Sequence, residues 1–304
     1  MKEKPIPAPV SSYVKSVIKA PAMLIGCRAI RTVISKPCCE YDIVVLSVDR
    51  RPNQVVKLDS HYAELLHISM GATVRRVFLT NSDAVILNDT HDLKLSSIKH
   101  AGLGNGGRLM TMSATARRLL ISSLLRHYDI ERFARKSPVI SSMLLKICAY
   151  EVVDGVLLFS GLPTSPLHQM DLLRQPILPN QAFSEGISLA LEIIGVERAT
   201  RSVLRRCFPA YSQLALNSYD KSLINEKMRH LYESGLTTDC YYYIGRMCSD
   251  ILKLREIKFC KSYSKLIQIG MDLSLDIEKL QKWNSQLSAL AKTLIRDHRT
   301  VIVG

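Results

Sequence analysis

Residues 22–29 of the chain read Ala-Met-Leu-Ile-Gly-Cys-Arg-Ala, and residues 40–46 read Glu-Tyr-Asp-Ile-Val-Val-Leu. The first apolar run stops at a glycine, and the second begins directly behind two acids. Side chains two positions apart on a β-strand lie on the same face, so Glu40 and Asp42 are predicted to stand side by side at the start of a strand. These two segments decide the expected fold of the first third of the chain.

Two neighbouring carboxylates repel each other unless a cation lies between them. Mg²⁺ prefers oxygen ligands and is commonly bound by one or two carboxylates together with substrate phosphates, and Mn²⁺ is the alternative ion. Backbone N–H groups in a glycine turn that opens a helix can bind phosphate. The pattern therefore indicates a metal and phosphate site around Gly26, Cys27, Glu40 and Asp42.

This order of features resembles the nucleotidyltransferase superfamily of polymerase-beta type, which includes the kanamycin and minimal nucleotidyltransferases. In that superfamily a Gly-Ser turn precedes an Asp-x-Asp pair at the start of a strand, and a neighbouring strand supplies a third acid. Gly26 and Asp42 match the pattern, whereas Cys27 replaces the serine and Glu40 replaces the first aspartate. The resemblance covers residues 1–100 and, more loosely, the rest of the chain.

The third acid has to be found by its position. Residues 54–69 form one or two extended segments by their alternation, and Glu64 lies in the better of them, so the resemblance makes Glu64 the third metal-site acid. Asp59, Asp83 and Asp89 are its rivals. The alternative is that all these acids merely keep strand ends and turns soluble.

At 304 residues the chain is expected to form two domains. The fold class predicted is α+β: a nucleotidyltransferase-like domain with a mixed β-sheet over residues 1–100, then a larger all-α domain over 109–304. Residues 102–107, Gly-Leu-Gly-Asn-Gly-Gly, satisfy the dinucleotide pattern G-x-G-x-x-G, but no buried strand precedes them. Residues 101–108 are therefore predicted to be a hinge.

Helices are expected from the 3.6-residue periodicity and from capping signals. A short one is predicted over 11–20, with Tyr13, Val14, Val17 and Ile18 on one side. Others are predicted from Ser113 toward His127, from Ser137-Pro138 onward, in a turn and helix over 161–174, and over 183–196, 219–233, 238–258 and 272–297, with glycine stops at 195 and 235.

Lys146, Tyr150 and Asp154 are spaced i, i+4, i+8 and form one stripe of a predicted helix. In antibiotic-modifying members of the superfamily, the helical domain supplies a lysine to the triphosphate and an acid to the acceptor hydroxyl. By resemblance Lys146 and Tyr150 are assigned to nucleotide binding and Asp154 to catalysis. The alternative is that Lys146 and Tyr150 reach solvent at the helix edge and that Asp154 caps a bend. His168 and Arg174 are secondary candidates at the cleft.

The charge and the cysteine content of the chain limit its expected partners and cellular compartment. The 41 Lys and Arg against 27 Asp and Glu give a net charge of +14, which favours anionic partners. The chain begins without an apolar leader and has no membrane-length apolar run, so a cytoplasmic protein without membrane contact is expected. Its eight cysteines lack Cys-x-x-Cys spacing and are expected to be thiols, with structural zinc disfavoured.

Three functions follow as expectations. The first is a Mg²⁺-dependent nucleotidyltransferase that binds ATP or another NTP and transfers the nucleoside monophosphate to an acceptor hydroxyl on a small molecule, RNA or protein, releasing pyrophosphate. The second is a domain of the same type without catalysis, which senses nucleotide or binds protein. The third is a basic nucleic-acid-binding protein. The C-terminal helices are candidates for pairing two copies of the chain.

Overall fold

The computed structural model describes residues 6–29, 40–47, 51–69, 83–90, 95–96, 105–175, 181–216 and 218–298. It divides into two compact units. The sheet unit comprises Met1–Thr111 with Ser222–Ile224, and the helical unit comprises Met112–Lys221 with Asn225–Gly304. This division lies close to the start of the helical domain predicted at residue 109.

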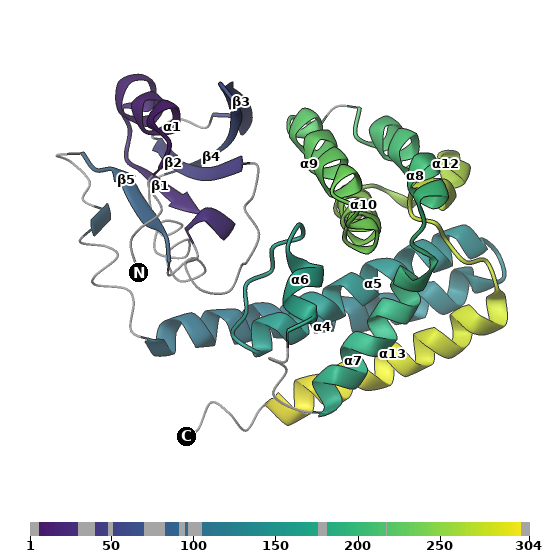
Figure 1. The fold of residues 1–304 in the computed structure, drawn as a ribbon. Helices are drawn as coiled ribbons and strands as arrows, with labels where there is room; N and C mark the ends of the chain where they lie inside the picture. The colour runs from purple at the N-terminus through teal and green to yellow at the C-terminus, as the bar shows by residue number, and fades with distance from the viewer. Residues whose placement is uncertain are drawn as a thin grey trace. The chain divides into compact units, whose positions relative to one another are not determined.

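The sheet unit contains a mixed sheet (Figure 1). Its strands among the described residues are β1 (Ala22–Ile25), β2 (Glu40–Ser47), β3 (Gln54–Leu58), β4 (His61–Ser69) and β5 (Val85–Asn88), in the order β3-β4-β2-β1-β5. The pairing of β2 with β4 is parallel, and the other pairings are antiparallel. The α+β class, the mixed sheet and the strands predicted at 40–46 and within 54–69 are confirmed.

One face of the sheet packs against the N-terminal helix, α1 (Ala8–Tyr13), which continues as a π-helical turn, η1 (Val14–Ile18). Val10 and Val14 are fully buried there together with Ile43, whereas Val17 is 59% exposed. Of the four residues predicted on one side of this helix, Val14 is in the core cluster, Tyr13 and Ile18 pack partly buried against it, and Val17 is largely exposed.

The other face of the sheet carries a second apolar cluster that includes Met23, Val44 and Leu46. Alternation along β2 places Glu40 and Asp42 on this same face, at the opposite end of the strand from Leu46. The middle of the sheet is thus apolar on both faces. Glu40 and Asp42 lie at one end, beyond the second apolar cluster.

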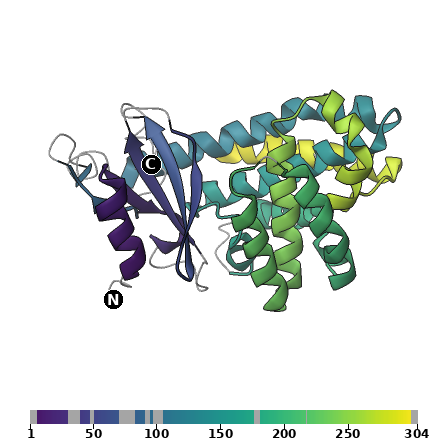
Figure 2. The ribbon, with the colours of Figure 1, turned by 90° about the horizontal axis from the view of Figure 1, so that it is seen from above.

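The helical unit is built from long amphipathic helices around a buried one (Figures 1 and 2). Its main helices are α4 (Asn105–Ala134), which begins in the sheet unit, α5 (Pro138–Phe159), α7 (Gln181–Ile194), α8 (Arg201–Leu214), α9 (Lys221–Glu233), α10 (Thr237–Leu252) and α13 (Ile277–Asp297). The shorter ones are α6 (Gln169–Leu173), α11 (Ile257–Ser262) and α12 (Ser264–Gly270).

The central helix α5 begins as predicted, with Ser137 before Pro138 at its first position. Nearly every side chain from Ile140 to Phe159 is buried. Gly155 lies within this helix, and a Cβ there would be 3.1 Å from Cγ of Leu120 in α4. The glycine allows α4 and α5 to pack closely, and α5 continues as one helix through Asp154 and Gly155 to Phe159.

Several helix ends agree with their sequence signals. Gly195 and Gly235 follow α7 and α9 in the left-handed region, at φ 81° and 74°. Asp276 caps α13, accepting a hydrogen bond from the Lys279 backbone N–H at 3.1 Å. Farther along α13, the Asn284 side chain donates to the His127 carbonyl of α4 at 3.2 Å.

Two features differ from the expectations. Residues 105–108 of the predicted hinge form the first turn of α4, where glycine is tolerated because the first N–H groups have no partner within the helix; residues 101–104 lie outside the described residues. Helix α8 was not predicted, since Pro209 interrupts the helical pattern of its sequence.

Candidate functional site

The turn after β1 is fixed by a contact between Gly26 and Asp42. Gly26 has φ +70°, and it begins a short 3-10 turn, η2 (Gly26–Arg28). Ile25 and Asp42 are partners in the antiparallel pairing of β1 with β2. A Cβ at residue 26 would lie 2.1 Å from Oδ2 of Asp42, so both the backbone conformation and the available space require glycine.

The acids of β2 and β4 meet through the parallel pairing of these strands. Asp42 is the register partner of Glu64, and Glu40 is the partner of Tyr62. Partners in register lie on one face of a sheet, so Asp42 and Glu64 are neighbours on the face that also carries Glu40. Asp42 and Glu64 are half-buried, whereas Glu40 is buried, at 4% exposure.

The rival acids occupy other positions. Asp59 lies in the exposed turn between β3 and β4. Oδ2 of Asp83 is 3.9 Å from Nη1 of Arg108. Asp89 accepts a hydrogen bond from the Leu95 backbone N–H at 2.6 Å. Of these candidates, Glu64 is the acid in register with Asp42.

The donor set fits a hard divalent cation held by two carboxylates. Within the part of the chain that the structure describes, no group of three His, Cys, Asp or Glu side chains is arranged to hold a metal ion. The predicted trio Glu40, Asp42 and Glu64 is therefore not such a group, and the Glu40 side chain is buried. Asp42 and Glu64 remain, and two carboxylates with substrate phosphates are a common way to bind Mg²⁺.

Cys27 lies in the turn beside this edge and is only 9% exposed. Its neighbour Arg28 places its guanidinium carbon 4.9 Å from the ring centre of Tyr41. Burial raises the pKa of the Tyr41 hydroxyl, while the Arg28 charge opposes that rise. Arg28 therefore lies against Tyr41, a residue of the sheet face opposite to Asp42 and Glu64, and the assignment of Cys27 to phosphate stays a prediction.

Lys146 lies inside the helical unit. It is 2% exposed, and its ammonium donates hydrogen bonds to the Met271 carbonyl at 2.5 Å and to the Tyr241 hydroxyl at 3.3 Å. Burial and the charge of Arg198 lower the pKa of Lys146 to about 7, against a smaller opposing effect of Asp272. The idea that Lys146 reaches solvent at the helix edge was wrong.

Tyr150 and Asp154 continue the same stripe and face α10. The Tyr150 hydroxyl donates to the Tyr242 carbonyl at 3.2 Å. Asp154 accepts from the Gln169 amide at 2.5 Å and pairs with Arg246 at 2.7 Å. Both predicted site residues are buried, so the stripe is real but points into the interior of the helical unit.

The two secondary candidates, His168 and Arg174, also lie in the helical unit. His168 is 3% exposed. Arg174 holds Asp239 with two hydrogen bonds, one of them at 3.0 Å, and Asp239 is itself buried. The partners Tyr241, Arg246 and Met271 were not identified from the sequence, since no local pattern links α5 to residues about a hundred positions away.

The predicted site residues thus form two groups. Those of the sheet unit gather at one end of β1, β2 and β4: Gly26, Cys27, Glu40, Asp42 and Glu64. Those of the helical unit form the buried stripe of Lys146, Tyr150 and Asp154. Each group is brought together within its own unit.

Comparison of the chain with protein-family models, curated proteins and solved structures found no match. None of the described helices has the length and apolar character needed to cross a membrane. The described cysteines are buried thiols, as expected, at positions 27, 148, 207, 240, 248 and 260; Cys38 and Cys39 lie outside the described residues.

Proposed function

We propose that the sheet unit is a nucleotidyltransferase-type domain of the polymerase-beta class that binds a nucleoside triphosphate with Mg²⁺. The observation that carries the proposal is the register of Asp42 with Glu64, combined with the Gly26 turn against Asp42. It brings a phosphate-binding type of turn and two carboxylates to one end of the sheet. The proposed reaction is transfer of a nucleoside monophosphate to an acceptor hydroxyl, with release of pyrophosphate.

The proposed roles follow from the chemistry of each group. Asp42 and Glu64 would hold Mg²⁺, which neutralises triphosphate charge and orients the phosphates. The backbone N–H groups after Gly26 would bind phosphate oxygens. Such reactions need positioning and charge stabilisation more than covalent help from the protein.

Lys146 and Asp154 receive no catalytic role in this proposal. Their charged groups are engaged by Met271, Tyr241 and Arg246 inside the helical unit. The proposal leaves the acceptor open among a small molecule, RNA and a protein hydroxyl.

The test is isothermal titration of the intact protein with ATP, CTP, GTP and UTP, with and without Mg²⁺. At least one nucleotide is expected to bind in a Mg²⁺-dependent manner, and Asp42→Asn and Glu64→Gln are each expected to weaken it tenfold or more. Asp59→Asn is the matched control, because Asp59 is an exposed turn acid five residues before Glu64, and asparagine tolerates its φ of +53°.

Two results would contradict the proposal. Absence of Mg²⁺-dependent binding to all four nucleotides would remove the triphosphate site. Equal weakening by Asp59→Asn and Asp42→Asn would show a general charge effect in place of a defined site.

A second candidate is a domain of the same type that binds nucleotide without catalysing transfer. The burial of Glu40 favours it, because the acid at the first position of the superfamily's pattern is not grouped with Asp42 and Glu64 to hold a metal ion. This candidate predicts Mg²⁺-dependent binding that Asp42→Asn abolishes, with no pyrophosphate released from the bound nucleotide in the presence of RNA, protein or small-molecule hydroxyls. Pyrophosphate release that Asp42→Asn abolishes would exclude it.

A further inference from the structure

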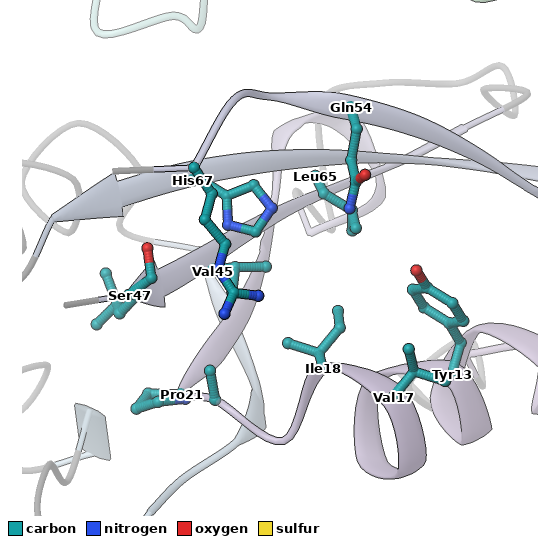
Figure 3. Close-up of a pocket in the computed structure, with 12 residues that line it drawn as sticks. Tyr13, Val17, Ile18, Pro21, Val45, Ser47, Gln54, Leu65 and His67 are labelled. Carbon is teal, nitrogen blue, oxygen red and sulfur yellow. The ribbon is translucent and has the colours of Figure 1, made fainter. Parts of the chain in front are cut away.

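A cavity of about 340 Å³ lies between the N-terminal helix and the sheet (Figure 3). Tyr13, Val17 and Ile18 line it from the helical side, and Val45 and His67 face them from the sheet. Its volume is at the lower end of the range for small-molecule sites.

This cavity is separate from the acidic edge. Val45 and Leu65 belong to the face of the sheet that packs against α1, whereas Asp42 and Glu64 lie on the other face. Val45 and His67 are also register partners near the ends of β2 and β4, away from the Asp42 end. A ligand in the cavity would therefore not contact the proposed nucleotide site.

The floor of the cavity is apolar and its rim is polar. Val45 and Leu65 are buried to 2% and 1% exposure. Tyr13, Arg51 and Gln54 add a hydroxyl, a guanidinium and an amide around the opening. Among the described residues, the lining contains no carboxylate, and Arg51 adds a positive charge to it.

His67 is held so that its ring borders this space. The His67 backbone N–H donates to the Asn53 side-chain oxygen at 2.9 Å. Nδ1 of the His67 ring is buried and has no hydrogen-bond partner among the described atoms. Burial and the charge of Arg51 lower the pKa of His67, so the ring is neutral at pH 7 and has one nitrogen that can donate and one that can accept.

We propose that the cavity binds a small organic acid, with its carboxylate at Arg51 and His67 and its apolar body against Val45, Leu65 and Ile18. A guanidinium binds a carboxylate through two parallel hydrogen bonds. A neutral imidazole beside it can donate a third. One cation matches the charge of a carboxylate better than that of a phosphate dianion.

The apolar floor contributes to selection. Burying apolar surface favours binding, so a ligand with an apolar body should bind at least tenfold more tightly than acetate. The neutral amide of the same shape would lose the interaction with Arg51. Affinity should thus require both the carboxylate and the apolar body.

The experiment uses isothermal titration of the intact protein with acetate, hexanoate, phenylacetate, phenylacetamide and phenyl phosphate, together with ¹⁵N NMR of the His67 ring. Hexanoate or phenylacetate is expected to bind saturably, at least tenfold more tightly than acetate and phenylacetamide, and to shift the His67 ring signals. Arg51→Gln should weaken this binding tenfold or more, and Arg118→Gln, at an exposed arginine of α4, should leave it unchanged.

A second variant fills the space without altering the core. Val17 is 59% exposed at the edge of the cavity, so Val17→Trp should fold normally and block the apolar body. Asp42→Asn should leave carboxylate binding unchanged, which separates this site from the nucleotide site. Failure of all carboxylates to bind, tighter binding of phenyl phosphate than of phenylacetate, or binding that survives both Arg51→Gln and Val17→Trp would overturn the proposal.

Discussion

The Asp42 carboxylate fills the space that a side chain at position 26 would occupy: a Cβ built on Gly26 lies 2.1 Å from Oδ2 of Asp42. The contact links the turn after β1 to the first half of β2. It makes the two most informative residues of the sequence dependent on each other, since neither the turn nor the carboxylate can keep its place if residue 26 gains a side chain.

Gly26→Ala should therefore destabilise the fold strongly. Strain at positive φ costs about 1–3 kcal/mol, and the clash with Asp42 adds about 1–3 kcal/mol. Gly235→Ala is the matched control, because Gly235 has a similar φ of +74° but no atom within 4 Å of its added Cβ. Urea unfolding should show a larger loss of unfolding free energy for Gly26→Ala than for Gly235→Ala.

The Asp42 contact can be isolated by a double-mutant cycle. In an Asp42→Ala background the nearest remaining atom is Cβ of residue 42, at 3.5 Å from the added Cβ, so Gly26→Ala should then cost about as much as Gly235→Ala. If Gly26→Ala lowers the unfolding free energy equally in both backgrounds, the contact between residue 26 and Asp42 is contradicted.

Gly245 allows a second close approach, between α10 and α5. A Cβ there would lie 2.3 Å from the Tyr150 hydroxyl oxygen. Gly245→Ala should lower the free energy of unfolding by about 1–2 kcal/mol, because overpacking of about 1–3 kcal/mol exceeds the roughly 1 kcal/mol gain in helix propensity.

Removing the Tyr150 hydroxyl should abolish or reverse the loss of stability caused by Gly245→Ala. In a Tyr150→Phe background the nearest atom is the ring carbon at 3.4 Å, and Gly245→Ala should become neutral or stabilising. Gly186→Ala in α7, whose added Cβ would lie 3.3 Å from the end of the Leu290 side chain and 3.7 Å from Val156, should change stability by less than about 1 kcal/mol. Thermal unfolding of the four variants of the cycle, with Gly186→Ala beside them, would measure these differences.

Lys146 should make stability depend on pH. The unfolded chain holds this proton up to the ordinary pKa of 10.5, whereas the folded chain releases it at about 7. Between these values the unfolded state binds more protons, so the contribution of Lys146 to stability rises with pH, and its full penalty is present below pH 7.

The measurement compares Lys146→Met with the natural chain in urea between pH 6 and pH 8.5. The difference in unfolding free energy should change by up to about 1.4 kcal/mol per pH unit above pH 7, in favour of the natural chain as pH rises. Lys265→Met, at an exposed lysine of α12, should give a difference that does not change with pH. A pH-independent difference for Lys146→Met would show that its folded pKa is not lowered.

Asp154 should behave as a structural residue. It is 3% exposed and pairs with Arg246, which is itself 12% exposed and also contacts Asp250 at 2.9 Å. Asp154→Asn should cost about 3 kcal/mol, because it removes the buried charge partner of a buried guanidinium and leaves it only the more exposed Asp250. Asp250→Asn should cost less than about 1 kcal/mol, because that side chain is 40% exposed.

Guanidinium chloride unfolding of these two variants distinguishes the structural role from a catalytic one. An Asp154→Asn protein as stable as the natural chain would favour the original assignment of Asp154 to chemistry.

The sequence by itself determined the local structure. Apolar runs bounded by glycine and acids marked β1 and β2, and Ser137-Pro138, Gly195 and Gly235 marked helix ends, because these signals act over a few neighbouring residues. Alternation along β2 also fixed the shared face of Glu40 and Asp42.

The tertiary structure decided which of these residues meet. The parallel register of β2 with β4 set Asp42 beside Glu64, and the approach of α10 turned Lys146, Tyr150 and Asp154 into the interior. The cavity between η1 and the sheet likewise depends on elements far apart in sequence. The periodicity of apolar and polar residues predicts which face of a helix or strand differs from the others. The environment of that face depends on the element that packs against it. The local sequence does not identify that packing partner.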